Sequence, residues 1–356
     1  MEAIILVGGR GTRLRPLTLG VPKPLLPVAG VPFLAHLLAR VRDAGIDHVV
    51  LATSYRAAAF TEHFGDGEAF GLDLEYVTEE EPLGTGGGIR NVADRLRSAA
   101  DEPVFVFNGD ILSGHDLKAQ LTRHEERQAA VTLHLVRVPD ARPFGCVPID
   151  EHGNVQAFME KCAEPVTNII NAGCYIFRRE VIDAIPRGRV VSVEREVFPA
   201  LLADGSTVVG YLDDAYWLDV GTPHAFVRAS CDLVRGLVPS SVLPGPTGEA
   251  LVMPSAAVSD AAAIAGGTFI GEDARVEVNA LVIGSVVFPG AVIEADAVVR
   301  GSIVGAGARI GAGAVLDGAV IGEGAHVGAR NELIGGARVW PQVVLPPVSI
   351  RFSSDE

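Results

Sequence analysis

Apolar and polar positions alternate in blocks along the first two thirds of the chain. Short apolar runs at 3–9, 48–54, 103–110 and 129–138 are typical of buried strands, and the apolar residues of 32–45 recur at helical spacing before a glycine. Strands that alternate with helices predict an α/β domain with a mostly parallel sheet. Ligands of such sheets bind at the carboxyl ends of the strands.

The last third has a different pattern, which begins after a Pro-, Gly- and Ser-rich stretch at 236–249. Aliphatic residues recur there every six positions, with two slips of register, and glycine follows many of them. A flexible Gly/Ala-rich tail would not keep such a register. The period predicts a parallel β-helix with three faces per coil and one inward aliphatic side chain per hexad. The expected inward residues are Val258, Ile264, Ile270, Val276, Val282, Val286, Val292, Val298, Val304, Ile310, Leu316, Ile321, Val327, Leu333, Val339 and Leu345.

These patterns divide the 356 residues into an expected catalytic domain at 1–235, a linker at 236–252, a β-helix at 253–347 and a tail at 348–356. A hydrophobic content of 48% with 21% charged residues excludes a disordered chain. Without an uncharged apolar run of about 20 residues, no transmembrane helix is expected. Four cysteines without CxxC spacing indicate a reducing, cytoplasmic location.

Charge is distributed unevenly along the chain. The formal net charge is −15, so we expect no non-specific binding to nucleic acid or to an anionic membrane. Residues 3–42 nevertheless hold six cations and no acid, which predicts that a small anion binds there. Only Lys23, Lys118 and Lys161 are lysines, against 26 arginines, so a retained lysine suggests a requirement for a compact point charge.

The sharpest motif is LVGGRGTRLRPLTLGVPKPLLPVAG, at 6–30. A strand ends there in a glycine-rich turn, which is followed by a basic loop punctuated by prolines. Gly8, Gly9 and Gly11 would allow backbone N–H groups to approach phosphate oxygens. Arg13 and Lys23 would then neutralise the phosphate charge.

Two other glycine-rich phosphate loops are excluded. A dinucleotide loop needs GxGxxG and an acid roughly 20 residues further on, but Leu14 occupies the third glycine position and no acid occurs before Asp43. The P-loop string GxxxxGK[ST] does not occur in the chain.

The motif at 6–30 and seven further motifs occur in the order typical of one family. In these motifs the chain resembles the sugar-1-phosphate nucleotidyltransferases, and most closely the mannose-1-phosphate guanylyltransferases of actinobacteria. The resemblance implies a Rossmann-like nucleotidyltransferase domain followed by a left-handed parallel β-helix of hexapeptide repeats. The further motifs are EEEPLGTGGG (79–88), FNGD (107–110), FGCVP (144–148), FMEK (158–161), INAGCYIF (170–177), SVEREVFPALL (192–202) and YWLDVGTP (216–223).

The activity implied by the resemblance is transfer of a guanylyl group from GTP to α-D-mannose 1-phosphate, which gives GDP-mannose and pyrophosphate. An oxygen of the sugar phosphate attacks the α-phosphorus in line, and Mg²⁺ helps to align and neutralise the two polyanions. A glucose-1-phosphate uridylyl- or thymidylyltransferase is the alternative within the class. A catalytically silent regulatory subunit and an additional acyltransferase activity of the β-helix are the alternatives from other classes.

The resemblance also assigns roles on the nucleotide side. Arg13 would hold the triphosphate and stabilise the leaving pyrophosphate, and Lys23 would reach the phosphates at the reaction centre. Asp110 and Asp219 would bind Mg²⁺, which prefers hard carboxylate oxygens. The implied nucleotide-binding residues are Leu6, Gly8, Gly9, Gly11, Thr12, Arg13, Glu81, Gly84, Thr85 and Asp110.

On the sugar-phosphate side, the residues implied are Gly145, Glu160, Lys161 and Asn171. Cys162 departs from the family pattern, in which a proline often follows the lysine. The carboxylate of Glu81 would suit guanine, whose N1–H and N2–H₂ are both donors. An equally good interpretation is that the Glu79–Glu81 run is a solvated charge cluster.

Three further expectations concern residues outside this chemistry. Ser192, with Glu194 and Glu196, is typical of a helix N-terminus with an acidic first turn, and needs no catalytic role. His36 lies in the helical stretch and is expected to be structural. The β-helix is expected to stack against the catalytic domain and to build a homo-oligomer, a dimer or a tetramer.

Overall fold

The computed structural model describes residues 1–9, 11–54, 56–159, 163–245 and 247–351, which fold as two compact units. The first unit joins Met1–Gly9 to Leu37–Trp217. The second joins Arg10–His36 to Leu218–Glu356, so the basic loop after the first strand belongs to the same unit as the β-helix.

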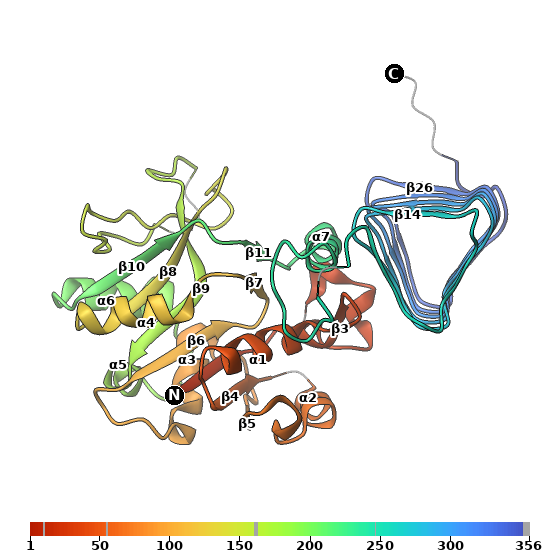
Figure 1. The fold of residues 1–356 in the computed structure, drawn as a ribbon. Coiled ribbons are helices and arrows are strands. Elements are labelled where there is room, and N and C mark those ends of the chain that lie inside the picture. The colour runs from red at the N-terminus through yellow and green to blue at the C-terminus, as the bar shows by residue number, and fades with distance from the viewer. Residues whose placement is uncertain (10, 55, 160–162, 246, 352–356) are drawn as a thin grey trace. The chain divides into compact units, whose positions relative to one another are not determined.

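A seven-stranded sheet forms the centre of the first unit (Figure 1), in the order β10-β8-β9-β6-β1-β4-β5. Strand β9 runs antiparallel to β6 and β8, and the other neighbours are parallel, which confirms the predicted mostly parallel sheet. The strands are β1 (Glu2–Leu6), β4 (His48–Thr53), β5 (Asp73–Thr78), β6 (Pro103–Asn108), β8 (Val131–Arg137), β9 (Ile169–Arg178) and β10 (Val208–Asp213).

Two of the described α-helices begin at residues whose side chains satisfy terminal backbone groups. Asp116 caps α4 by accepting hydrogen bonds from the N–H groups of Lys118 and Ala119, and Thr222 caps α7 through the N–H of Ala225. No helix in the described ranges is long and apolar enough to cross a membrane. The helices are α1 (Phe33–Asp43), α2 (Ala57–Phe64), α3 (Gly84–Val92), α4 (Leu117–Glu126), α5 (Arg179–Ala184), α6 (Phe198–Ala203) and α7 (Pro223–Val234).

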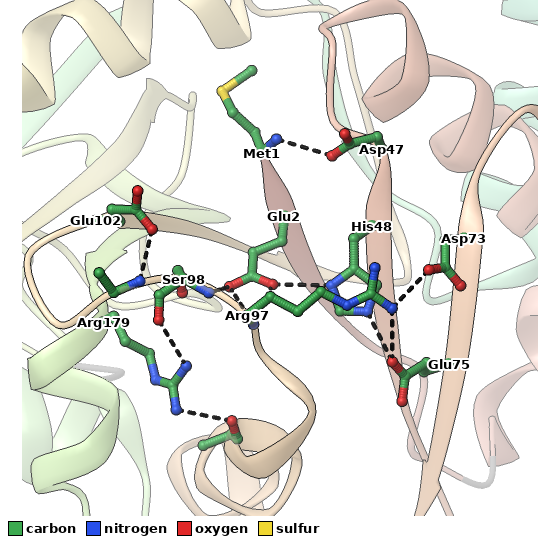
Figure 2. Close-up of polar contacts among 12 residues, drawn as sticks. Met1, Glu2, Asp47, His48, Asp73, Glu75, Arg97, Ser98, Glu102 and Arg179 are labelled. Carbon is green, nitrogen blue, oxygen red and sulfur yellow. Dashed lines mark hydrogen bonds and ion pairs between the residues drawn. The ribbon is translucent and has the colours of Figure 1, made fainter.

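A charged cluster holds the amino-terminal ends of β1, β4 and β5 together (Figure 2). The buried carboxylate of Glu2 pairs with His48 Nδ1 at 2.9 Å and accepts the backbone N–H groups of Arg97 and Ser98 at 2.9 and 2.8 Å. Burial alone would raise the pKa of Glu2, but these hydrogen bonds outweigh it and lower that pKa to about 2. The cluster therefore fixes the loop that precedes β6 to the start of the sheet.

The second unit contains a parallel β-helix, whose coils stack as a triangle in Figure 1. One face has the strands β12 (Ala250–Val252), β15 (Thr268–Ile270), β18 (Val286–Val287), β21 (Ile303–Val304), β24 (Val320–Ile321) and β27 (Arg338–Val339). The second has β13 (Ala257–Val258), β16 (Arg275–Val276), β19 (Val292–Ile293), β22 (Arg309–Ile310), β25 (His326–Val327) and β28 (Val344–Leu345). The third has β14 (Ala263–Ala265), β17 (Leu281–Ile283), β20 (Val298–Arg300), β23 (Val315–Asp317) and β26 (Glu332–Ile334).

The inward register of the β-helix was predicted correctly except in one coil. The interior contains Val287, Ile293 and Val299, and the expected residues Val286, Val292 and Val298 lie outside that cluster. Each wrong residue immediately precedes the right one in an aliphatic pair, and a shift of one residue along a strand reverses the side chain's face. The residues that stack on the first face are Ile270, Val287, Val304, Ile321 and Val339.

The coil is shortened by one residue at the same corner of successive turns. Gly284, Gly301 and Gly318 occupy this corner with φ of 52°, 50° and 64°. Glycine adopts this left-handed conformation without the steric cost of a Cβ. The three hexads that contain these glycines are five residues long, from Val282 to Val287, Val299 to Val304 and Leu316 to Ile321, so the aliphatic period slips there.

Within the second unit, the loop that follows the phosphate motif packs on α7 and on the β-helix. The N–H of Ala29 donates to Ser230 Oγ of α7 at 3.0 Å, and Arg338 of β27 donates to the carbonyl oxygen of Arg15 at 2.7 Å. A Cβ built on Gly30 would lie only 2.7 Å from the ring of Phe269 in β15. The β-helix thus supports the backbone of the basic loop directly.

We expect Gly30→Ala to lower the free energy of unfolding by about 1–3 kcal/mol, because its new methyl overlaps the Phe269 ring and strains a backbone with φ of +85°. Urea unfolding followed by tryptophan fluorescence measures the loss. Gly245→Ala is the matched control, since Gly245 also has a positive φ, +112°, but its Cβ would meet nothing within 4 Å. Equal losses in the two variants would contradict the packing explanation.

Candidate functional site

The glycine turn begins where β1 ends, at the carboxyl edge of the sheet. Leu6 is half-buried, and Gly8 and Gly9 are exposed. The N–H of Gly9 donates to Ser54 Oγ at 3.4 Å, so the turn is anchored to the loop that follows β4. Gly8 and Gly9 therefore present an open backbone at the edge where parallel sheets bind ligands.

Arg13 and Lys23 are carried by neighbouring 3-10 turns of the second unit, η1 (Thr12–Leu14) and η3 (Lys23–Leu25). Gly11 allows the two turns to meet, since its Cβ position lies 3.1 Å from the Cβ of Lys23. Leu14, the last residue of η1, is fully buried, while Thr12 and Arg13 are exposed. Buried prolines flank Lys23 on both sides and fix the backbone that presents its side chain.

Arg13 and Asp219 converge on one glycine, although 206 positions separate them in the chain. Asp219 ends the short strand β11 (Trp217–Asp219), and Gly221 follows just before α7. A Cβ at Gly221 would lie 2.6 Å from Arg13 Nη2 and 2.9 Å from Asp219 Oδ1. The second unit therefore places a cation suited to phosphate beside a carboxylate suited to a metal ion.

Asp110 lies at the carboxyl end of β6 in the first unit. The preceding residue, Gly109, donates its N–H to the carbonyl oxygen of Leu6 at 2.9 Å. A Cβ at Gly109 would lie 2.7 Å from that same oxygen, so only glycine allows the two strand ends to approach so closely. Asp110 is half-buried and adjoins the end of β1.

The segment PLGTGG (82–87), which holds the implied nucleotide-binding residues Gly84 and Thr85, runs into the first turn of α3. Glu81 is exposed. Glu79 is half-buried, its carboxylate accepts the N–H of Leu83 at 3.3 Å, and burial raises its pKa. The interpretation of Glu79–Glu81 as a solvated charge run therefore fits Glu80 and Glu81 but not Glu79.

Glu194 was predicted only as part of a helix N-terminus, yet it also contacts Thr85 in the segment 82–87. Ser192 caps the π-helix η6 (Val193–Val197) by accepting the N–H of Arg195, which confirms the predicted N-terminus. In addition, Thr85 Oγ1 donates to Glu194 Oε2 at 3.0 Å across 109 positions of the chain. No local sequence pattern signals such a contact, because the tertiary fold alone brings the two segments together.

On the sugar-phosphate side, Asn171 of β9 is held by Tyr175 and by its own strand. Asn171 Nδ2 donates to the Tyr175 hydroxyl at 2.7 Å, and its Oδ1 accepts the N–H of Gly173 at 3.0 Å. Gly145 is buried and precedes Cys146, which pairs through its backbone with Met159. Glu160 and Lys161, the remaining expected residues, lie outside the described residues.

Known proteins match both parts of the chain. Residues 2–236 match the family model described as "Nucleotidyl transferase", and residues 246–350 match the "GMPPB C-terminal domain". A mannose-1-phosphate guanylyltransferase of Mycobacterium tuberculosis is 60% identical over 356 residues, covering 100% of this chain and 98% of that protein. Mannose-1-phosphate guanylyltransferase 1 of Arabidopsis thaliana is 34% identical, over 80% of this chain and 79% of its own.

A solved structure matches the fold as well. HddC from Yersinia pseudotuberculosis, which has also been crystallised in complex with GMP-PN, superposes with a TM-score of 0.56 and 28% identity. The superposition covers 64% of this chain and 97% of that protein.

Proposed function

The chain belongs to the nucleotidyl transferase family, and we propose on that premise that it transfers a guanylyl group from GTP to α-D-mannose 1-phosphate. GDP-mannose and pyrophosphate are the products. The observation that carries this proposal is the 60% identity, over the full length, to a mannose-1-phosphate guanylyltransferase. The convergence of Arg13 and Asp219 on Gly221 supports it independently, because this reaction needs a cation for phosphate next to a metal ligand.

In this proposal the basic loop binds the triphosphate. The backbone of the exposed glycine turn and the guanidinium of Arg13 hold the β- and γ-phosphates and stabilise the charge that develops on the leaving pyrophosphate. Lys23 reaches the α-phosphate, where the oxygen of the sugar phosphate attacks. Leu6, Gly8, Gly9, Gly11, Thr12, Glu81, Gly84 and Thr85 complete the proposed nucleotide site. Aligning the two polyanions is the main task of these residues, since the protein forms no covalent bond.

Nucleotidyltransferases of this family generally use a divalent metal ion, and we propose Mg²⁺. Asp110 and Asp219 would hold it, and their carboxylate oxygens suit a hard cation that keeps water and phosphate oxygens in its shell. No group of three His, Cys, Asp or Glu residues able to hold a metal occurs in the described part of the chain, so most ligands would come from the nucleotide and water. When bound, the ion offsets negative charge on the phosphates.

We propose that the sugar phosphate binds through Lys161 and the sugar hydroxyls through Glu160, Asn171 and the backbone of Gly145. The hydrogen bonds from Asn171 to Tyr175 and from Gly173 to Asn171 support this role, because they fix the amide before the sugar arrives.

Substrate choice is tested with a matrix of GTP, UTP and dTTP against mannose and glucose 1-phosphates, with pyrophosphate release as the readout. We expect GTP with mannose 1-phosphate to have the largest kcat/KM, by about tenfold or more, because base and sugar are recognised by hydrogen bonds that the wrong partner leaves unmade. A larger value for UTP or dTTP with glucose 1-phosphate would replace this assignment by the uridylyl- or thymidylyltransferase. No turnover with any pair would favour a regulatory subunit.

We also propose that the chain forms a homo-oligomer, a dimer or a tetramer, in the cytoplasm. The exposed apolar side chains of Trp340, Val344 and Ile350 near the end of the β-helix support association. The buried free thiols of Cys146, Cys174 and Cys231 suit a reducing compartment. Light scattering on the purified protein measures the mass, and a monomer would contradict the association.

A further inference from the structure

The first turn of α3 is tied to residues 191–194 by a set of side-chain hydrogen bonds. Thr85 Oγ1 donates to Glu194 Oε2 at 3.0 Å and accepts the N–H of Val193 at 3.0 Å. Ser192 Oγ donates to the same Glu194 oxygen at 2.9 Å. The one hydroxyl proton of Thr85 is thus used within the protein, so its hydroxyl could meet a ligand only as a hydrogen-bond acceptor.

Backbone hydrogen bonds also join the first turn of α3 to Val191. The N–H groups of Gly86 and Gly87 both donate to the carbonyl oxygen of Val191, at 2.8 and 3.2 Å, and the N–H of Val191 donates to the carbonyl oxygen of Leu83 at 2.9 Å. A Cβ at Gly84 would lie 2.7 Å from the Val191 oxygen. These glycines therefore allow the first turn of α3 to pack closely against Val191. The position of α3 thus depends on residues 191–194.

Glu194 also lies near the proposed sugar side. The Tyr175 phenol is fully buried, and its pKa is raised well above the usual value, first by burial and then by the negative charge of Glu194. The hydroxyl of the same phenol accepts a hydrogen bond from Asn171 Nδ2 at 2.7 Å. Glu194 therefore acts electrostatically on the phenol that accepts a hydrogen bond from Asn171, a side chain expected to bind the sugar.

We propose that Glu194 is a positioning residue for the nucleotide: it holds Thr85, and with it the first turn of α3, in the orientation that the base requires. The inference rests on the proposed function, in which Gly84 and Thr85 of this turn belong to the nucleotide site; we place the base beside them. It assigns Glu194 no contact with substrate, and it explains why an acidic residue follows the capping Ser192.

The test compares Glu194→Ala with Glu194→Gln in the full-length protein. Glu194→Ala removes an acceptor that serves two hydroxyl groups, so we expect KM for GTP to rise about tenfold or more, while KM for mannose 1-phosphate changes less than about twofold. Glu194→Gln keeps an oxygen acceptor at the same place, and its KM for GTP should return to within about threefold of the wild-type value.

Two further variants separate positioning from general support of the fold. Thr85→Val should raise KM for GTP like Glu194→Ala, and the double variant should be no worse than either single one, because both remove the same tie. Glu196→Ala is the matched control: Glu196 Oε1 accepts the Ser192 N–H at 2.9 Å at the same helix terminus. Its KM for GTP should stay near the wild-type value.

The inference fails if Glu194→Ala and Glu196→Ala raise KM for GTP equally, if both substrates lose affinity together, or if Glu194→Ala has no effect. These results differ from a failure of the proposed function. If the wild-type protein prefers another nucleotide, KM for that nucleotide decides the inference. If it turns over no pair, calorimetric titration with GTP decides it, since Glu194→Ala must then weaken binding and Glu194→Gln must not.

Discussion

Lys23→Ala is expected to lower kcat by about 10²–10³-fold, the usual effect of removing one preorganised charge from a transition state. Lys23 would offset negative charge at the α-phosphate, and the alanine variant leaves that charge uncompensated. The melting temperature should change by no more than about 2 °C, because the side chain is only half-buried. Pyrophosphate release and thermal unfolding monitored by circular dichroism give the two quantities.

The fold explains why this lysine should be so sensitive. Its backbone is confined between Pro22 and Pro24, and its Cβ lies against Gly11, so the ammonium is presented from a rigid turn. Lys23→Arg keeps the charge but spreads it over a planar guanidinium of different reach, and we expect it to recover only part of the lost rate.

The chain offers its own control in Lys118, an exposed lysine on α4. Lys118→Ala removes the same charge from the same protein and should leave kcat within about twofold of the wild-type value. Full activity in Lys23→Ala, or an equal loss in Lys118→Ala, would remove Lys23 from the reaction centre.

The first strands, α1 and the β-helix were predictable because their patterns are local. The run at 48–54 became β4 and the run at 103–110 became β6, both within two residues of the expected ends. Three of the β-helix positions were misjudged because Val286, Val292 and Val298 each precede another aliphatic residue, so hydrophobicity alone did not distinguish the inward member.

Local sequence patterns do not show which segments of the chain make up each of the two compact units. The linear sequence predicts a boundary near 236. In the structure, the segment around Arg13 and Lys23 groups with α7 and the β-helix in one compact unit. Contacts such as Gly30 with Phe269 and Arg15 with Arg338 join residues more than 200 positions apart. They leave no periodic pattern, and neither does the hydrogen bond between Thr85 and Glu194.

Acidification below pH 6.5 is expected to destabilise the protein steeply, because four histidines are buried in the neutral form. Burial lowers the pKa of His36 and His124 to about 4, and it also lowers that of His115 and His134. A histidine with a depressed pKa in the folded state takes up its proton on unfolding. Its stabilising contribution is therefore complete above pH 6.5 and is lost as the pH falls toward 4.

His115 and His134 make the effect cooperative. Their rings stack with centroids 3.5 Å apart, and Arg40 Nη2 lies 3.0 Å from His115 Nδ1. A proton on either ring would place a second charge beside the other ring and the arginine, although Asp213 pairs with His134 at 3.0 Å and opposes this. Each histidine should remove about 1.4 kcal/mol from the free energy of unfolding per pH unit once it titrates fully in the unfolded chain.

Urea unfolding between pH 7.5 and 4.5, a range set by these shifts, measures the loss. In His124→Gln one titrating group is absent, so the slope of unfolding free energy against pH should fall by about 1.4 kcal/mol per unit below pH 6. His152→Gln is the control, since the His152 side chain is 71% exposed and should leave the slope unchanged.

The carboxylate of Glu2, with a pKa lowered to about 2, contributes its own loss of unfolding free energy only below pH 4.5, so the two effects separate along the pH axis. If the free energy of unfolding of the wild-type protein stays constant between pH 6.5 and 4.5, these histidines take up protons in the folded state as readily as in the unfolded chain, which would contradict the prediction.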